Sequence, residues 1–151
     1  MKNWINKYLS VEDLESIKSE ITAVEKKTLG EIVVSLRERR NLFQKLYKPH
    51  EIAVRDFEKL ISYKTAQKNG ILLFVLFEER FYDILADEGI YSKISDSVWD
   101  ELESRLEEEF KKGNYLDGIC YIIKKMGDIL AKEFPGGVGD IDELADEVKI
   151  N

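Results

Sequence analysis

Acidic and amide side chains recur at the turns of this sequence, and they are the residues best suited to chemistry. Gly30-Glu31 precedes one apolar run, Asn69-Gly70 precedes a second, and Asp87-Glu88-Gly89 follows a third. Ser95-Asp96 then begins a helical pattern. Carboxylate and amide oxygens suit Ca²⁺ or Mg²⁺. Glu31, Asp87 and Asp96 are therefore candidate metal ligands, and Asn69 and Glu88 are candidate ligand-binding neighbours. These residue types also form turns and caps, which is the commoner reason for their presence.

Other reactive side chains are few, and no catalytic residue can be assigned. Asp83 and Asp87 share one face of a predicted strand, but four residues separate them by about 13 Å. Catalytic carboxylate pairs in glycosidases lie about 5–9 Å apart. His50 is the only histidine, which excludes a multi-histidine metal site. Cys120 is the only cysteine and lies on an inward helical stripe, so we expect a buried structural thiol.

Charge is unevenly distributed along the chain. The formal net charge is −7, which disfavours general binding to nucleic acid. Residues 37–48 carry five bases against one acid, whereas residues 135–151 carry five acids against one base. Arg37, Arg39 and Arg40 are therefore candidates for binding an anionic ligand, a protein partner or the acidic tail. Plain exposure to solvent is the commoner outcome for such a segment.

The elements that must position these residues are predicted in the order helix, strand, helix, strand, strand, helix, helix. Apolar residues at spacings of three and four predict helices that begin at Ser10, near Pro49, at Ser95 and at Tyr115. The first is expected to end at Leu29-Gly30, with a left-handed glycine, and the third at Gly113. Strands are predicted over 32–36, 71–77 and 81–86.

The order of these elements predicts an α/β fold, a three-layer α/β/α sandwich with a small mixed sheet. The first two strands are expected to be parallel and the third antiparallel beside the second. The turns that carry Glu31, Asn69 and Asp87 should then lie at one edge of the sheet, near Asp96.

Length and composition predict one α/β domain over residues 1–134, followed by an acidic tail over 135–151. The sequence shows no secretory signal and no run of about 20 apolar residues, so we expect a cytoplasmic protein without a transmembrane segment. The opposite charges suggest that Asp140–Glu147 docks on Arg37–Lys48. No partner is specified.

Several motifs together resemble the TPM domain family, which is named partly for a plant thylakoid phosphatase. The matching stretches are Thr28-Leu29-Gly30-Glu31-Ile32-Val33-Val34, Lys64-Thr65, Lys68-Asn69-Gly70-Ile71-Leu72-Leu73, Ala86-Asp87-Glu88-Gly89-Ile90, Trp99, Phe110-Lys111-Lys112-Gly113-Asn114-Tyr115, Gly118-Ile119 and residues 140–148. The resemblance is to short bacterial members and covers nearly the whole chain. It implies an α/β/α sandwich.

The resemblance implies less about activity. Acid phosphatase activity and divalent-ion binding are attributed to plant relatives, whereas other members are accessory proteins. Asp87 and Asp96 hold places comparable to acidic residues of the phosphatase members, and Glu31 matches the Gly-Glu motif. The run after the third strand differs from the Gly-X-Gly-Leu-Glu of the long members. Our leading hypothesis is a non-catalytic binding or accessory domain; the alternative is a weak divalent-metal-dependent acid phosphatase that uses Ca²⁺ or Mg²⁺.

Overall fold

A computed structural model describes residues 3–62, 69–136 and 147–151 of the chain. It contains helical and extended segments, including a four-residue strand near the C-terminus. In chain order they are η1 (Asn3–Lys7), α1 (Val11–Glu25), β1 (Glu31–Arg37), η2 (Gln44–Leu46), α2 (Pro49–Phe57), η3 (Glu58–Ser62), β2 (Gly70–Leu76), β3 (Phe81–Ala86), α3 (Glu88–Tyr91), α4 (Asp96–Lys111), α5 (Tyr115–Glu133) and β4 (Glu147–Ile150).

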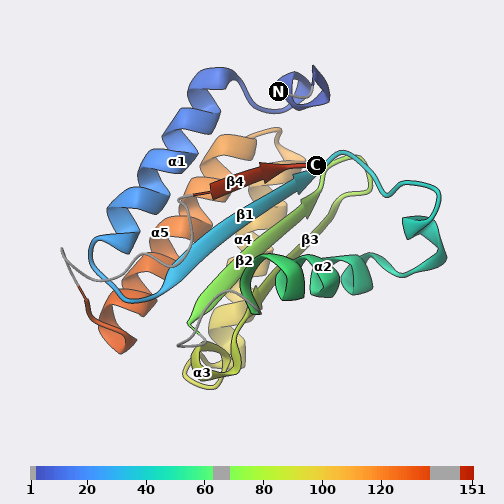
Figure 1. Cartoon of the computed structure of the whole chain (residues 1–151). Coiled ribbons are helices and arrows are strands. Elements are labelled where there is room, and N and C mark those ends of the chain that lie inside the picture. Colours follow the sequence, from blue (N-terminus) through green and yellow to red (C-terminus); the bar gives the residue numbers. More distant parts are fainter. Residues whose placement is uncertain (1–2, 63–68, 137–146) are drawn as a thin grey trace.

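The described strands form one mixed sheet in the order β3-β2-β1-β4 (Figure 1). β1 pairs in parallel with β2, and β3 is antiparallel to β2. Both pairings were predicted by the order of elements and are confirmed. β4 pairs in parallel with the other side of β1. The sequence pattern did not predict β4, because four residues within an acidic segment carry little strand signal.

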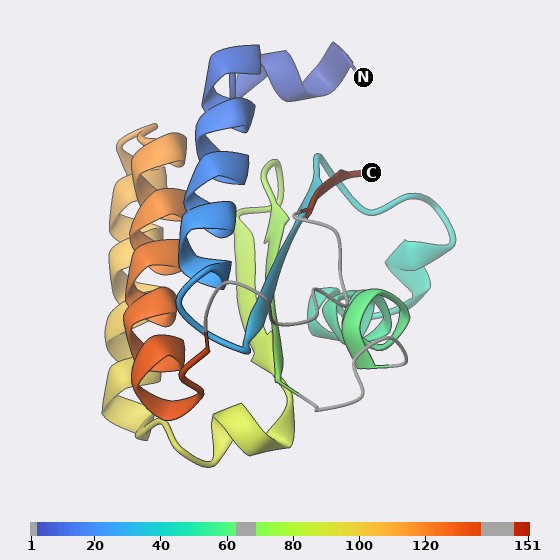
Figure 2. The ribbon, with the colours of Figure 1, turned by 60° about the vertical axis from the view of Figure 1, so that its left-hand side comes forward.

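Helices cover both faces of the sheet, which confirms the three-layer α/β/α sandwich (Figure 2). All seven residues of β2 are buried because alternate side chains enter two separate cores. Ile71, Leu73 and Val75 pack with α1, α4 and α5, whereas Leu72 and Phe74 pack with α2 and η3. Among the described residues, no helix is long and apolar enough to cross a membrane.

Caps and glycines explain where several helices begin and end. Ser10 caps α1 in a reciprocal capping box with Asp13. Gly113 follows α4 with φ of +79°, as predicted. The prediction for Gly30 was wrong, because α1 ends at Glu25 and Gly30 does not have a positive φ. Close packing explains this glycine instead, since a Cβ there would lie 2.7 Å from Leu130 Cδ2.

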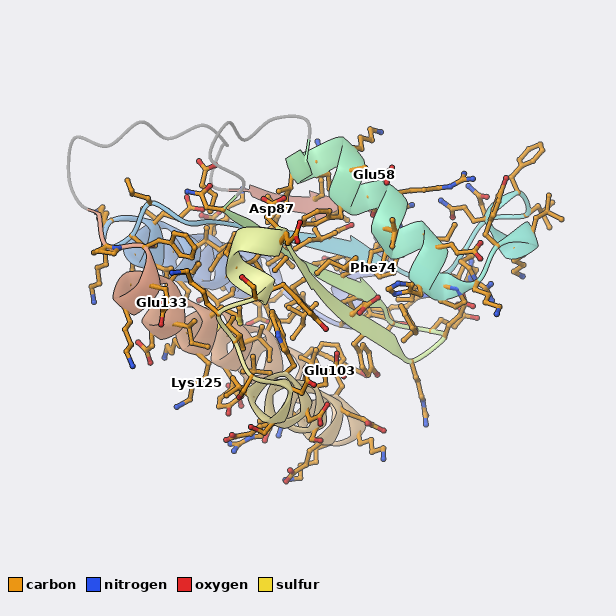
Figure 3. The ribbon with its side chains drawn as sticks, turned by 90° about the horizontal axis from the view of Figure 1, so that it is seen from below. Glu58, Phe74, Asp87, Glu103, Lys125 and Glu133 are labelled. Carbon is orange, nitrogen blue, oxygen red and sulfur yellow. The ribbon has the colours of Figure 1, made fainter. Side chains whose placement is uncertain are left out.

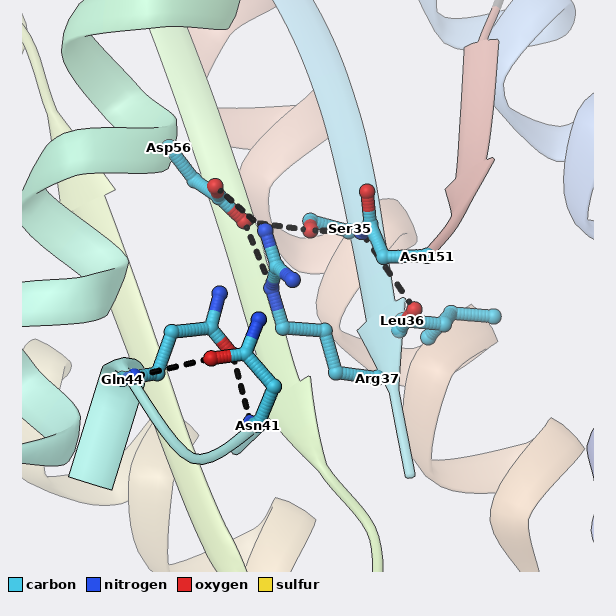
Figure 4. Close-up of polar contacts among 7 residues, drawn as sticks. All are labelled: Ser35, Leu36, Arg37, Asn41, Gln44, Asp56 and Asn151. Carbon is cyan, nitrogen blue, oxygen red and sulfur yellow. Dashed lines mark hydrogen bonds and ion pairs between the residues drawn. The ribbon is translucent and has the colours of Figure 1, made fainter. Parts of the chain in front are cut away.

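A polar network joins β1, α2 and the C-terminal residue (Figure 4). The buried Asp56 carboxylate accepts a hydrogen bond from Ser35 Oγ at 2.8 Å and forms an ion pair with Arg37 at 2.8 Å. The Asn151 side-chain amide donates to Ser35 Oγ and to Leu36 O. The network therefore anchors the residue that follows β4 to the centre of the sheet. The proposed docking of the acidic tail falls mostly on residues 137–146, outside the described residues.

Candidate functional site

The structure brings together three of the predicted site residues where β1 and β2 begin and β3 ends. The Glu31 amide donates to Asn69 O at 3.1 Å, and the Asp87 amide donates to Gly70 O at 3.0 Å. Glu31, Asn69 and Asp87 are each at most 5% exposed. The expectation that these turns meet at one edge of the sheet is therefore correct.

Two of these polar side chains hold the strand ends together. Asp87 Oδ2 accepts a hydrogen bond from the Gly70 amide at 2.8 Å, and Asn69 Nδ2 donates to Leu29 O. Gly70 has no room for a side chain, since a Cβ there would overlap Ile61. Asn69 Oδ1 is buried, and no donor in the described part of the chain reaches it. The Asn69 and Asp87 side chains thus help to hold the strand ends together at this edge.

The other predicted metal ligand, Asp96, is exposed, unlike the buried residues of this edge. Asp96 is the exposed first residue of α4, and Glu88 is exposed at the start of α3. Within residues 3–62, 69–136 and 147–151, no group of three or more His, Cys, Asp or Glu side chains is arranged to hold a metal ion. The Ca²⁺ or Mg²⁺ site at Glu31, Asp87 and Asp96 therefore remains a prediction.

Asp96 instead lines a cleft of about 480 Å³, which we call the acidic cleft. The residues that line it come from α2, β3, α3 and α4. They are His50, Asp83, Ile84, Leu85, Ala86, Tyr91, Asp96, Trp99, Asp100 and Glu103. Four of them are carboxylates, and none of these described lining residues is a lysine or an arginine. Figure 3 shows Glu103 on the part of α4 that lies beside β3.

The acidic cleft follows the open side of β3, which is a terminal strand among those described. Asp83 is paired with Phe74 in the register of β2 and β3, so its side chain lies on the α2 side of the sheet. There its Oδ2 atom contacts His50 Nδ1 at 2.5 Å. The neighbouring Ile84 lies on the α4 side, so the cleft wraps around the strand edge.

Burial controls the electrostatics of the acidic cleft. Burial raises the pKa of Asp83 above its ordinary value, although the hydrogen bond with His50 opposes this shift. Burial also raises the pKa of Glu103, and the neighbouring charges of Asp83 and Asp100 add to the effect. A bound cation would favour the ionised form of Glu103 against the charges of Asp83 and Asp100.

An aromatic pair supplies the apolar part of the same cleft. The rings of Tyr91 and Trp99 stack with centroids 5.4 Å apart. Tyr91 is 54% exposed, whereas Trp99 is only 6% exposed. Within the described residues, the Trp99 indole Nε1 has no hydrogen-bond acceptor. A buried N–H without an acceptor is costly in a folded protein.

Comparisons with known proteins agree with this architecture. The sequence model of the TPM domain family matches residues 5–129, which is most of the chain. The chain belongs to the TPM domain family. Its structure is similar to the NMR structure of the BA42 protein from the psychrophilic bacterium Bizionia argentinensis, with a TM-score of 0.83 and 33% identity. That match covers 95% of this chain and 96% of the other.

More distant structures share the fold of this TPM domain. One is the N-terminal domain of the cg2496 protein from Corynebacterium glutamicum, with a TM-score of 0.62 and 13% identity over 89% of this chain and 80% of that one. Another is the N-terminal domain of a P. gingivalis protein, with a TM-score of 0.68 and 16% identity over 84% and 79%. No curated protein sequence matches the chain significantly.

The basic candidates of this TPM domain all pair with carboxylates of the same chain. Arg37 pairs with Asp56, Arg39 with Glu78 at 2.7 Å, and Arg40 with Glu79 at 2.6 Å. The side chains of Arg37 and Arg40 are mostly covered, at 17% and 20% exposed. An external anion would compete with these internal partners for all three guanidinium groups.

Sequence reasoning missed most of the acidic cleft of the TPM domain. Asp96, Asp100 and Glu103 recur at spacings of four and three, which places them on one face of α4, and this signal could have been used. Asp83 was considered only as a partner of Asp87. Its actual partner, His50, comes from α2, and no local pattern links the two.

Proposed function

We propose that this TPM domain is a non-catalytic binding domain that accepts an extended, basic segment of a protein partner in the acidic cleft. The carrying observation is the set of four carboxylates around an open strand edge, with His50 as the one basic side chain among the described lining residues. A lysine or arginine of the partner would neutralise charges that now raise the pKa of Glu103. The Tyr91–Trp99 pair would pack against the aliphatic part of such a side chain.

The spread of the carboxylates favours an organic cation over a bare metal ion. They line a cleft of about 480 Å³, and no three acidic, histidine or cysteine side chains in the described ranges converge on one point. A divalent ion needs several oxygens within about 2.0–2.6 Å. A flexible side chain that ends in an ammonium or guanidinium group can reach separate carboxylates along the cleft.

The open edge of β3 favours an extended partner chain. The Asp87 amide donates a hydrogen bond to Gly70 O. Because hydrogen-bonded pairs alternate along an antiparallel ladder, the backbone N–H and C=O groups of the odd-numbered residues of β3 point toward β2. The backbone groups of Tyr82, Ile84 and Ala86 then face the cleft. The nearby Ile84 amide favours the ionised form of the Asp83 carboxylate and so slightly opposes the rise in its pKa that burial causes. A partner strand could pair with this edge while its alternate side chains meet the acidic groups.

A peptide of alternating lysine and valine tests the proposal. Binding can be followed by fluorescence of Trp99 in a Trp4→Phe background, since these are the two tryptophans of the chain. We expect binding that weakens with salt, and little binding of the same peptide with norleucine in place of lysine. Glu103→Gln should weaken binding by roughly 1.4- to 5-fold, because an exposed ion pair contributes about 0.2–1 kcal/mol.

Glu107→Gln is the matched control, because Glu107 is an exposed α4 residue that lies outside the cleft lining. It removes the same charge from the same helix and should leave binding unchanged. Equal weakening by Glu103→Gln and Glu107→Gln would contradict a specific cleft, since it would show attraction to the net charge alone. Failure of the peptide to bind at low salt would also contradict the proposal.

The alternative is the weak divalent-metal-dependent acid phosphatase that the sequence suggested. The observation in its favour is the buried oxygen-rich edge at Glu31 and Asp87, where Asn69 Oδ1 has no donor among the described residues. Phosphate release from p-nitrophenyl phosphate with Mg²⁺ or Ca²⁺ tests it directly. Activity that persists through purification, requires the divalent ion and is lost in Glu31→Gln, with the fold checked by circular dichroism, would replace the binding proposal.

A further inference from the structure

Three large apolar side chains project from the segment between β1 and α2. Leu42, Phe43 and Leu46 are 84%, 80% and 79% exposed, and together we call them the apolar tip. The segment that carries them extends away from the sheet beside α2 (Figure 1). Single exposed apolar residues are common, but three within five positions form a feature that needs a reason.

The apolar tip is held in a defined conformation. Asn41 and Gln44 exchange two hydrogen bonds, each from the backbone amide of one to the side chain of the other, at 2.9 and 2.8 Å (Figure 4). Arg40 donates to Tyr47 O at 2.7 Å and pairs with Glu79. Arg55 lies over the Tyr47 ring, 3.9 Å from its centroid. These contacts at both ends present the tip to solvent without relying on burial of its apolar side chains.

Positive charge flanks the apolar tip. Arg39 and Arg40 are already paired with Glu78 and Glu79. Lys45 and Lys48 are exposed, and neither forms an ion pair with another described residue. The hydrogen bond from Arg40 lowers the pKa of Glu79, and the charge of Lys45 adds to this effect. The tip therefore combines three exposed apolar side chains with two cations available to an external anion.

We propose that the apolar tip inserts into the interface of an anionic lipid bilayer, with Lys45 and Lys48 against the headgroups. A bilayer can take up each projecting side chain separately, and apolar residues flanked by lysines are the composition that such interfaces bind. The net charge of −7 means that an anionic surface repels most of this molecule. The positive charge of residues 37–48 then favours the orientation in which the apolar tip faces the lipid. This inference does not depend on ligand binding in the acidic cleft.

Co-sedimentation of the full chain with vesicles tests the inference. We expect binding to phosphatidylcholine vesicles that contain phosphatidylserine, and weaker binding to phosphatidylcholine alone. The triple variant Leu42→Ser, Phe43→Ser, Leu46→Ser should lower the partition coefficient at least about tenfold, because it removes the apolar area that would be buried. These side chains are exposed, so the variant should keep its fold, which circular dichroism can check.

Two further variants test whether binding is specific to the apolar tip and whether the lysines supply the preference for anionic lipid. Val11→Ser removes another exposed apolar side chain, at 53% exposure, and should leave vesicle binding unchanged. Lys45→Glu with Lys48→Glu should remove the preference for phosphatidylserine. No binding to either vesicle, or binding that the triple variant retains, would overturn the inference. Concentration-dependent self-association that the triple variant abolishes, without vesicle binding, would overturn it in favour of a contact between two copies.

Discussion

The Asp56 ion pair offers the sharpest test of how the sheet is anchored. Asp56 accepts three hydrogen bonds, from Ser35 Oγ at 2.8 Å, Arg37 Nη2 at 2.8 Å and Arg37 Nε at 3.2 Å. The side chains of Asp56 and Arg37 are 9% and 17% exposed. Asp56→Ala would leave a largely buried guanidinium without its partner. Breaking a buried pair in this way costs about 3–5 kcal/mol, and the residual exposure of Arg37 places the expected loss at about 3 kcal/mol.

Urea denaturation measures this loss as a lower midpoint at an unchanged slope. The double variant Asp56→Leu, Arg37→Met should recover much of the stability, because it removes both buried charges and restores apolar packing. Glu107→Ala, which removes an exposed ion pair with Lys111, should cost at most about 0.5 kcal/mol. The reasoning is refuted if Asp56→Ala costs less than about 1 kcal/mol, or if the double variant is as unstable as the sum of its single variants.

Three further predictions follow from packing and ionisation. Gly127→Ala should lower the free energy of unfolding by about 1–3 kcal/mol, because a Cβ there would lie 2.5 Å from Val24 Cγ2 at the contact of α5 with α1. A change in the free energy of unfolding that is within experimental error, measured by urea denaturation, would contradict this prediction. Burial raises the pKa of Cys120 to about 11, so its reaction with a disulfide reagent should be slow at neutral pH and accelerate as pH rises toward that value. Burial raises the pKa of Asp83 and Glu103, so both carboxyls ionise above the ordinary carboxyl range. Calorimetry should therefore show that the affinity for the peptide rises with pH through this range and becomes constant once both groups are ionised. An affinity that falls over this range would be inconsistent with carboxylate recognition.

Much of the fold could be predicted because its signals are local. The apolar run of β2, the capping box at Ser10 and the turn at Gly113 each depend on a few adjacent residues. β4 could not be predicted in the same way, because its four residues are stabilised by pairing with β1, more than a hundred positions earlier in the sequence. Gly30 was misassigned for a related reason, since the residue that excludes a side chain there is Leu130.

The candidate site was predicted in part. Turn motifs correctly placed Glu31, Asn69 and Asp87 at one edge, but sequence could not show that Asp87 holds the Gly70 amide. The acidic face of α4 was visible in the spacing of its residues. Its relation to the edge of β3 and to His50 depends on how the layers pack, and only the structure supplies that relation.

Amide hydrogen exchange along β3 tests the central claim most directly. The backbone amides of Tyr82, Ile84 and Ala86 point away from β2, because hydrogen-bonded pairs alternate along the ladder between β2 and β3. If a basic peptide pairs with this edge in the acidic cleft, their exchange should slow when the lysine–valine peptide is added and should not slow with the norleucine control. Unchanged exchange at these amides, in a sample where the peptide is demonstrably bound, would contradict the proposed mode of binding.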